Sequence, residues 1–261
     1  MFNNKVVVIT GAGSGIGRAL AIQLATAGAR LALSDVNQAG LDETLQLLPS
    51  GSTAKGYQLD VSSWEAFQAH AEEVKTDFGT AHFIINNAGA TVVGTVAHTS
   101  IEEYEWQLGI NMWGVLYGTK AFLPMMQAQR EGCIVNISSV FGLLAFPTQS
   151  AYNMSKFAVR GLTECLWQEL DGSGVRGDVA DRRADPQPPL GVLAGVGEFL
   201  DLFDVLDGDQ TGQPPFLVYH QQFLDAVLVQ ELFRFLQADA LADRHQPVFG
   251  HDLRDLFVHV G

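Results

Sequence analysis

Cysteine, basic residues and long apolar runs are all scarce in this chain. Its only two cysteines, Cys133 and Cys165, are too few for a disulfide framework and are typical of a reducing compartment. The 15 lysines and arginines against 29 acidic residues give a net charge of −14, which argues against nucleic acid or an anionic membrane as a partner. No apolar run is long enough to span a bilayer, and the N-terminus leads into a strand without a signal sequence. We therefore expect a cytoplasmic location, with no metal site.

The remaining composition is that of a folded protein. Hydrophobic residues make up 47% and charged residues 17% of the 261 residues, which is enough to build the core of one α/β domain. The charge is uneven along the chain. Residues 1–176 carry 10 basic and 15 acidic side chains, residues 177–261 carry 5 and 14, and no lysine follows Lys156.

Up to about residue 171, short apolar runs alternate with amphipathic segments. This alternation predicts the α/β class, with a Rossmann-like, doubly wound parallel sheet covered on both faces. Ser100, followed by Glu102 and Glu103, predicts a helix start. The expected strands are 5–10, 30–35, 54–60, 81–86 and 132–138, and the expected helices are 15–28, 38–48, 63–78, 100–128 and 150–170.

A glycine-rich turn joins the first expected strand to the first expected helix. It reads Thr10-Gly11-Ala12-Gly13-Ser14-Gly15-Ile16-Gly17. Glycines let the backbone approach a pyrophosphate, and a helix N-terminus offers free N–H groups and a positive dipole. We expect a dinucleotide to bind at Gly11, Ser14, Gly15, Ile16 and Gly17. A tight turn with no ligand is the alternative.

Asp35 ends the second expected strand, about 20 residues after the glycines. A carboxylate at this place accepts hydrogen bonds from an adenosine ribose and repels a 2′-phosphate, and neither Ser14 nor Val36 supplies a cation beside it. The sequence therefore favours NAD over NADP. The structural alternative is that Asp35 caps the helix expected at 38–48.

Polar residues also follow the third and fourth expected strands. Asp60 follows the third strand, and the run Asn86-Asn87-Ala88-Gly89 follows the fourth. Open α/β sheets bind ligands at the carboxyl ends of their strands, so these residues are candidates for the cofactor site. Ordinary turn chemistry explains each of them equally well.

Ser139, Tyr152 and Lys156 form the expected catalytic centre. Ser139 ends the fifth expected strand, and Tyr152 and Lys156 lie one helical turn apart on one face. A tyrosine is a poor acid–base catalyst near neutral pH unless its pKa falls, and a lysine one turn away supplies the positive charge that lowers it. Tyr152 would exchange a proton with the substrate oxygen, Ser139 would hold that oxygen, and Lys156 could also bind the nicotinamide ribose. For an isolated pair, a solvated helix face is the alternative.

Residues 1–176 resemble the short-chain dehydrogenase/reductase family. The shared motifs are the turn 10–17, Asp35, Asp60-Val61, Asn86-Asn87-Ala88-Gly89, Asn111, Ser139 and the pair Tyr152/Lys156. The resemblance implies a Rossmann-like dinucleotide-binding and catalytic domain, with Asp60, Val61, Asn87, Ala88 and Gly89 at the cofactor. It also implies that Asn111 holds a water in a proton relay, although a structural role explains Asn111 equally well. Helices 100–128 and 150–170 would keep apolar faces for a homo-oligomer contact.

The resemblance stops after Arg176. The family continues into a sixth strand, a Pro-Gly turn beside the nicotinamide and a seventh strand, whereas this chain continues with Gly177-Asp178-Val179-Ala180. We expect 177–261 to be a poorly ordered tail outside the family, with one amphipathic helix at 221–241. Without a sixth strand, the fifth would be an exposed apolar edge, and the protein would have low solubility.

The composition of the tail suggests its origin. Read backwards as the translation of the opposite DNA strand, it resembles IMP dehydrogenase around the end of its regulatory CBS pair. Our hypothesis is that the tail is an antisense translation fused to an interrupted dehydrogenase gene, which implies no IMP dehydrogenase function. A divergent substrate lobe and a frame shift are the alternatives.

The sequence thus predicts an NAD(P)-dependent oxidoreductase that interconverts a small-molecule alcohol and a ketone or aldehyde. The alternative is a nucleotide-binding fragment without turnover, and a weaker one makes the acidic tail a protein-interaction module. The apolar residues after Ser139 favour an apolar substrate, although core packing explains them as well. These residues are Phe141, Leu143, Leu144 and Phe146.

Overall fold

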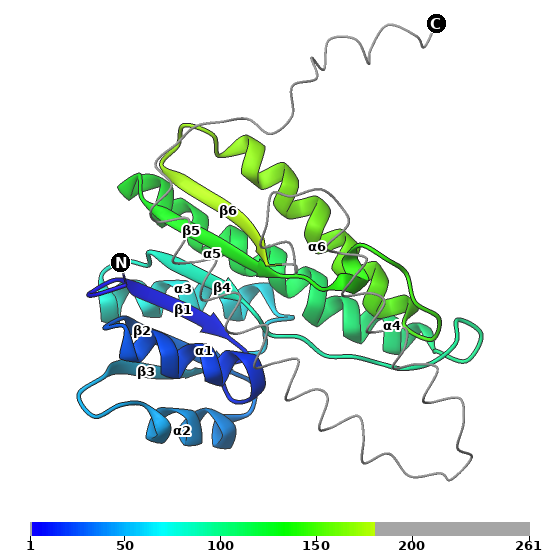
Figure 1. The fold of residues 1–261 in the computed structure, drawn as a ribbon, viewed down its shortest axis with the longest axis horizontal. Coiled ribbons are helices and arrows are strands. Elements are labelled where there is room, and N and C mark those ends of the chain that lie inside the picture. The colour runs from blue at the N-terminus through cyan, green and yellow to red at the C-terminus, as the bar shows by residue number, and fades with distance from the viewer. Residues whose placement is uncertain (1, 181–261) are drawn as a thin grey trace, which may run out of the picture.

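Residues 2–180, the part of the chain that the computed structural model describes, form a parallel sheet with helices on both faces (Figure 1). The six strands lie in the order β3-β2-β1-β4-β5-β6. This is the doubly wound, Rossmann-like class that the alternation predicts, and each of the five expected strands overlaps one of β1 to β5. The elements in chain order are β1 Val6–Thr10, α1 Gly15–Thr26, β2 Arg30–Asp35, α2 Gln38–Leu47, β3 Thr53–Gln58, α3 Trp64–Phe78, β4 Phe83–Asn86, α4 Ile101–Leu108, η1 Gly109–Trp113, α5 Gly114–Gln129, β5 Gly132–Ile137, η2 Val140–Gly142, α6 Ser150–Glu169 and β6 Val175–Ala180.

Each central strand supplies two cores, because successive side chains of a strand point to opposite faces. Val7 and Ile9 of β1 belong to a cluster that includes residues of α1 and α2. Val6 and Val8 belong to a second cluster, which includes residues of α3, α5 and α6. Because both faces of the sheet are covered, its central strands are continuous apolar runs.

The sixth strand overturns one prediction. β6 pairs in parallel with β5 along its whole length, from Val175 opposite Gly132 to Ala180 opposite Ile137. The expectation that β5 is an exposed edge is therefore wrong, and so is the expectation that no sixth strand follows Arg176. The argument for low solubility loses its basis with them.

Contacts with neighbouring elements explain why β6 forms from residues that are weak strand formers. A Cβ added at Gly177 would lie 3.0 Å from two side-chain carbons of Leu166 on α6, so a glycine lets the helix approach the strand. The carboxylate of Asp178 accepts a hydrogen bond from Cys133 Sγ at 3.2 Å and pairs with Arg176 at 3.0 Å. The carboxylate of Asp178 thus has partners within the fold, although aspartate disfavours a strand when the sequence is considered alone.

The helix expected at 100–128 is divided into three parts. It starts as predicted at Ser100, whose side chain accepts from Glu103 N while Glu103 accepts from Ser100 N, forming a capping box. The α-helical hydrogen bonding then changes to π-helical bonding over η1, which contains Asn111, and returns over α5. Single π-helical turns inside α-helices are frequent at functional sites.

The predicted helix 221–241, the order of the tail beyond β6 and the antisense hypothesis for its origin lie outside the described residues. Within residues 2–180, no helix has both the length and the hydropathy that crossing a membrane requires. The same part of the chain contains no group of three or more His, Cys, Asp or Glu side chains arranged to hold a metal ion.

Candidate functional site

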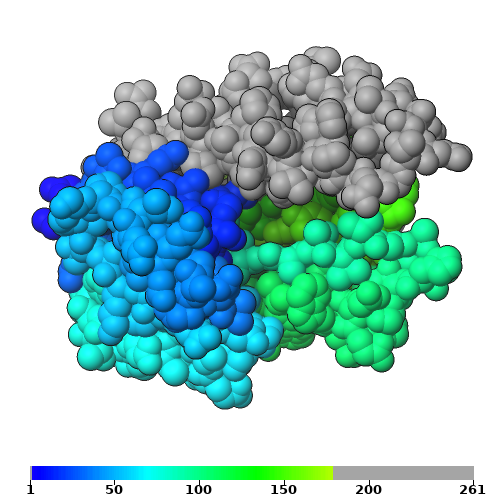
Figure 2. All heavy atoms as spheres, turned by 90° about the horizontal axis from the view of Figure 1, so that it is seen from below, coloured from blue at the N-terminus to red at the C-terminus, as the bar shows by residue number. Residues whose placement is uncertain are grey.

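The predicted site residues gather along one edge of the sheet. Every neighbouring pair of strands is parallel, so the carboxyl ends of the strands all lie along this edge. The arrows of β1, β5 and β6 show this direction in Figure 1. The glycine turn follows β1, Asp35 ends β2, Asn87 follows β4 and Ser139 follows β5. Figure 2 shows the N-terminal part of the chain, in blue, beside the green segment on one face of the molecule.

The glycine turn has a backbone that a dinucleotide phosphate fits. Gly11 and Gly15 adopt positive φ angles of 67° and 50°, which favour glycine. A Cβ added at Gly17 would lie 2.1 Å from the carbonyl oxygen of Gly11, so no side chain is tolerated there. Ser14 is exposed and makes no side-chain cap to α1. The N–H groups of the first helical turn are therefore not capped by Ser14 and face an exposed turn, as anion binding requires.

Asn87 fastens this turn to the end of β4. Its side-chain amide donates to Thr10 O at 2.9 Å and to Gly11 O at 3.3 Å. The hydroxyl of Thr10 accepts in return from the backbone N–H groups of Asn87 and Ala88, both at 3.0 Å. Ala88 and the exposed Gly89 continue from this anchor. Asn87 therefore shapes the glycine turn, whatever it contributes to a ligand.

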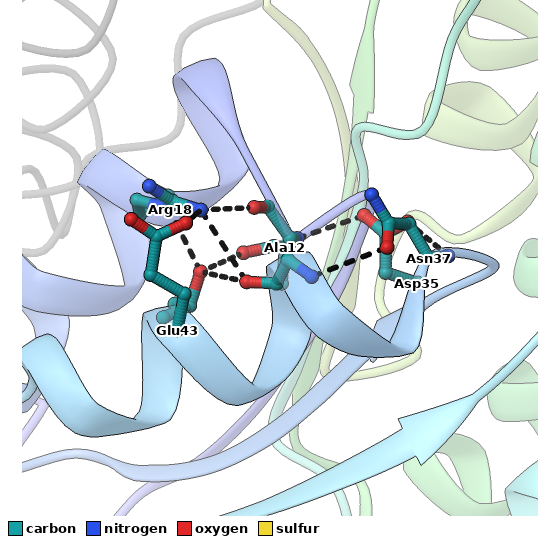
Figure 3. Close-up of polar contacts among 8 residues, drawn as sticks. Ala12, Arg18, Asp35, Asn37 and Glu43 are labelled. Carbon is teal, nitrogen blue, oxygen red and sulfur yellow. Dashed lines mark hydrogen bonds and ion pairs between the residues drawn. The ribbon is translucent and has the colours of Figure 1, made fainter.

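Asp35 lies against the other side of the turn (Figure 3). One carboxylate oxygen accepts from Gly13 N at 2.8 Å and the other from Asn37 N at 2.9 Å. Asn37, not Asp35, is the N-cap of α2, because its side chain accepts from Gly40 N at 3.2 Å. The helix-capping alternative for Asp35 is therefore wrong. A carboxylate has about four lone-pair positions, so Asp35 keeps capacity for further donors.

Arg18 is a residue of this region that the sequence reasoning missed. Its guanidinium donates to Gly13 O at 2.5 Å and pairs with Glu43 of α2 at 2.7 Å (Figure 3). Thr44, which accepts from Arg18 Nε at 3.0 Å, donates to Ala12 O at 2.8 Å. These contacts hold the turn, α1 and α2 together. The available signal was a basic residue directly after the last glycine of the turn.

Asp60 and Val61 lie beyond the end of β3. Asp60 is exposed, and its carboxylate accepts from the backbone N–H of Ser62 at 2.9 Å and from its hydroxyl at 2.6 Å. Val61 is buried in the core that includes α3 and α5. The turn chemistry considered for Asp60 is therefore present. Its position at the same edge of the sheet also keeps it a candidate for the cofactor site.

The structure brings Ser139, Tyr152 and Lys156 into one cluster. The Lys156 ammonium lies 5.4 Å from the centre of the Tyr152 ring and donates to the carbonyl of Ile137, two residues before Ser139, at 2.8 Å. Ser139 Oγ accepts from Phe141 N at 3.2 Å, and the Phe141 ring packs edge-on against Tyr152. Ser139 and Tyr152 are half-buried, and Lys156 is 4% exposed. The solvated helix face considered for the Tyr/Lys pair is therefore wrong.

Burial changes the acidity of Lys156. Removing the ammonium from water disfavours its charged form and lowers the pKa of Lys156 to about 8. Physiological pH is thus close to the pKa of Lys156. A buried titratable group of this kind beside a tyrosine ring is typical of acid–base sites.

Asn111 and Gln107 form an amide clamp on the loop that follows Gly89. Asn111 accepts from Ala90 N and donates to Ala90 O, both at 2.8 Å. Gln107, one turn earlier, donates to Ala90 O at 3.0 Å and accepts from Val92 N at 3.2 Å. Both side chains are fully buried. The structural role considered for Asn111 is thus present. Gln107 was missed, although its polar side chain at i−4 from Asn111 was a usable signal.

The sequence of this chain is similar to those of known proteins. The family model described as short chain dehydrogenase matches residues 5–180, which extends four residues beyond the predicted end of the resemblance. The protein SadH of Mycobacterium tuberculosis is 53% identical over 170 residues, which are 65% of this chain and 62% of SadH. The meso-2,3-butanediol dehydrogenase of Serratia marcescens is 38% identical over 175 residues, 67% of this chain and 69% of that protein.

Solved structures of dehydrogenases and reductases are similar to this chain as well. The NAD⁺-bound xylitol dehydrogenase has a TM-score of 0.66 and 35% identity, covering 68% of this chain and 69% of that one. Levodione reductase has a TM-score of 0.67 and 31% identity, covering 69% and 71%. The fold and the residues of the site are those of the Rossmann-type enzymes that bind dinucleotides. The chain belongs to the short-chain dehydrogenase family.

Proposed function

We propose that this chain is an NAD-dependent oxidoreductase that interconverts an alcohol and a ketone or aldehyde. The observation that carries the proposal is the burial of Lys156 beside the Tyr152 ring, at the strand edge where Ser139 and the glycine turn also lie. The working unit is residues 1–176 with the remainder of β6. The dehydrogenase and reductase names of the relatives support the reaction type.

The residues at the strand edge fit a dinucleotide. Gly11, Ser14, Gly15, Ile16 and Gly17 would hold the pyrophosphate at the start of α1. Asp35 would accept from the adenosine ribose, and its charge would oppose a 2′-phosphate. Asp60 and Val61 would lie toward the adenine, and Asn87, Ala88 and Gly89 toward the nicotinamide. When bound, the cofactor supplies or accepts the hydride.

Each side chain of the catalytic cluster has a distinct task in the proposal. The Tyr152 hydroxyl gives a proton to the substrate oxygen during reduction and takes it back during oxidation. The Ser139 hydroxyl donates a hydrogen bond to that oxygen. The Lys156 ammonium stabilises the Tyr152 phenolate and contacts the nicotinamide ribose. The water-relay role of Asn111 stays a prediction beside its contacts to Ala90 and Ser155.

Turnover decides between an enzyme and a nucleotide-binding fragment. The fragment is the second candidate because the family match ends at residue 180 of a 261-residue chain. The full chain would be incubated with NAD⁺ and meso-2,3-butanediol, xylitol or 2-octanol, while NADH formation is followed by absorbance. NADH binding in a fluorescence titration without turnover on any alcohol would favour the fragment. Tighter binding of NADPH than of NADH would contradict the preference assigned to Asp35.

Tyr152→Phe separates proton transfer from cofactor binding. We expect this variant to lose turnover by about 10²-fold or more and to bind NADH as tightly as the wild type, because only the hydroxyl is removed. Lys156→Ala should weaken both turnover and NADH binding. Most of the activity surviving in Tyr152→Phe would remove Tyr152 from the proposed mechanism.

A further inference from the structure

The loop that follows Gly89 runs between the two regions of the proposed site. Gly89 ends the run expected near the nicotinamide, and the next residues reach the start of α6, which carries Tyr152. Thr91 Oγ1 donates to the side chain of Gln149 at 3.1 Å, and Gly94 N donates to Thr148 O at 2.9 Å. The loop is therefore hydrogen-bonded to the two residues that precede α6.

The backbone of this loop is held chiefly by two side-chain amides. Ala90 exchanges both of its backbone hydrogen bonds with Asn111. The Nδ2 of Asn111 also donates to Ser155 Oγ at 3.3 Å, and Ser155 Oγ donates to the carbonyl of Tyr152 at 2.7 Å. This chain of contacts joins the loop to the helical turn that carries the tyrosine. Asn111 accepts from Ala90 N, not from Val92 N, so Val92 N needs another acceptor.

Gln107 supplies that missing partner. It accepts from Val92 N and gives Ala90 O a second donor, so it fixes the direction of the chain over residues 90–92 as a neighbouring strand would. Its side chain has 0% exposure, so neither amide atom can exchange its partner for water without opening the structure. The orientation of the amide follows from its partners, an N–H and a C=O.

We infer that Gln107 is a positioning residue for the reaction. It fixes residues 90–92 so that the loop between the proposed nicotinamide site and α6 holds the substrate over Tyr152. This role rests on the proposed function. The hydrogen bonds of Gln107 go to Ala90 and Val92, which are neither catalytic nor cofactor residues in the proposal, so its effect should fall on substrate binding and not on NAD binding.

The test replaces Gln107 with methionine, which keeps the length and helix propensity of the side chain and removes both hydrogen bonds. We expect the KM for the alcohol that the wild type oxidises best to rise about tenfold, while the Kd for NADH stays within about twofold of the wild-type value. The amide of Val92 should exchange with deuterium about tenfold faster or more. Gln68→Met, on the exposed face of α3, is the matched control and should change none of these quantities.

Several outcomes would overturn the inference. A lower melting temperature with an unchanged KM would mean that Gln107 only stabilises the fold. Equal exchange at Val92 in both proteins would mean that the loop does not depend on Gln107. A wild-type chain that oxidises none of the three alcohols would overturn the proposed function and, with it, this role in turnover. An active wild type with an unaffected Gln107→Met would overturn this inference alone.

Discussion

Burying the charged Lys156 beside Tyr152 lowers the free energy of unfolding. Its ammonium is almost fully removed from water and keeps one hydrogen bond, to the carbonyl of Ile137. Burial lowers the pKa of Lys156 to about 8 from the ordinary 10.5. At neutral pH the folded chain therefore holds a charge that the unfolded chain solvates better. Residues of this kind persist where the reaction needs them, and replacing them commonly stabilises a protein that can no longer work.

Lys156→Met should therefore be inactive and more stable. We expect its free energy of unfolding at pH 7 to exceed that of the wild type by about 1–2 kcal/mol, because about 3 kcal/mol of desolvation is relieved and one hydrogen bond is lost. Between pH 8 and 10.5 the unfolded wild type binds more protons than the folded one, so wild-type stability rises with pH. The difference between the two proteins should shrink over that window. Urea titrations at pH 7 and pH 10 measure it, and a less stable Lys156→Met at both values would contradict the assignment.

His70 is a second buried side chain whose charged form is disfavoured by burial. It packs among the rings of Tyr57, Phe67 and Phe122, and neither ring nitrogen meets a hydrogen-bond partner among the described residues. Burial lowers the pKa of His70 to about 4 from the ordinary 6.5. The stability that depends on neutral His70 is therefore complete above pH 6.5 and is lost as the pH falls toward 4.

His70→Phe should reduce this loss. We expect the wild type to lose about 2 kcal/mol of unfolding free energy through His70 between pH 7.5 and pH 5, and His70→Phe to be free of that component. At pH 7.5 the variant should be more stable by about 1–3 kcal/mol, because two unpaired buried nitrogens disappear. Chemical denaturation at both pH values tests this. The exposed His98, replaced by Gln, is the control and should follow the wild type.

At the scale of elements, the central sheet follows directly from the sequence. The strands β1 to β5 could be predicted because their residues are short apolar runs between turns, as a sheet buried on both faces requires. β6 could not, because Gly177 and Asp178 disfavour a strand until Leu166, Arg176 and Cys133 are placed around them. Tertiary contacts here outweigh local propensity.

The same distinction applies to the site. The types of residue at the strand ends were predictable from spacing, including the glycine turn, Asp35 and the Tyr152/Lys156 pair. The interruption of the long helix by η1 and the contacts of Arg18, Asn87 and Gln107 were not. Each of these depends on a backbone carbonyl or N–H group from a distant segment, and no periodicity in the sequence encodes that partner.

The pairing of β6 makes a prediction for amide exchange. The amides of 175–180 should exchange slowly, like those of β5, while the exposed residues of the loop 93–98 should exchange fast. Gly177→Val should speed exchange across β6, because the added side chain collides with Leu166 and forces β6 away from α6. Gly161→Ala is the control, since nothing lies within 4 Å of an added Cβ there. Fast exchange at 175–180 in the wild type would mean that β6 is not a stable part of the sheet.

At the scale of the whole molecule, the described part leaves an apolar stripe uncovered on α6. Met154 and Phe157 are 53% and 44% exposed, and the exposed Gly161 and Cys165 continue the stripe at helical spacing. A glycine in the middle of a helix costs about 1 kcal/mol relative to alanine, and the space around Gly161 is open within the chain. A close approach by another helix would account for it. The homo-oligomer contact expected through the helices in 100–128 and 150–170 therefore stays a prediction with a defined location.

Phe157→Glu tests this contact in the full-length chain. If a second copy packs on the stripe, a buried and unpaired carboxylate should raise the dissociation constant of the oligomer by about tenfold or more, because the charge must lose its hydration on association. Sedimentation velocity over a range of concentrations would measure the change. Ala69→Glu, which places the same charge on the exposed face of α3, should leave the association unchanged. A wild-type chain that sediments as a monomer at all concentrations, or a Phe157→Glu variant that associates as tightly as the wild type, would remove α6 from the interface. Tyr152 and Lys156 lie on the same helix as this stripe. The turnover of Phe157→Glu should therefore also show whether α6 needs a partner for the proposed activity.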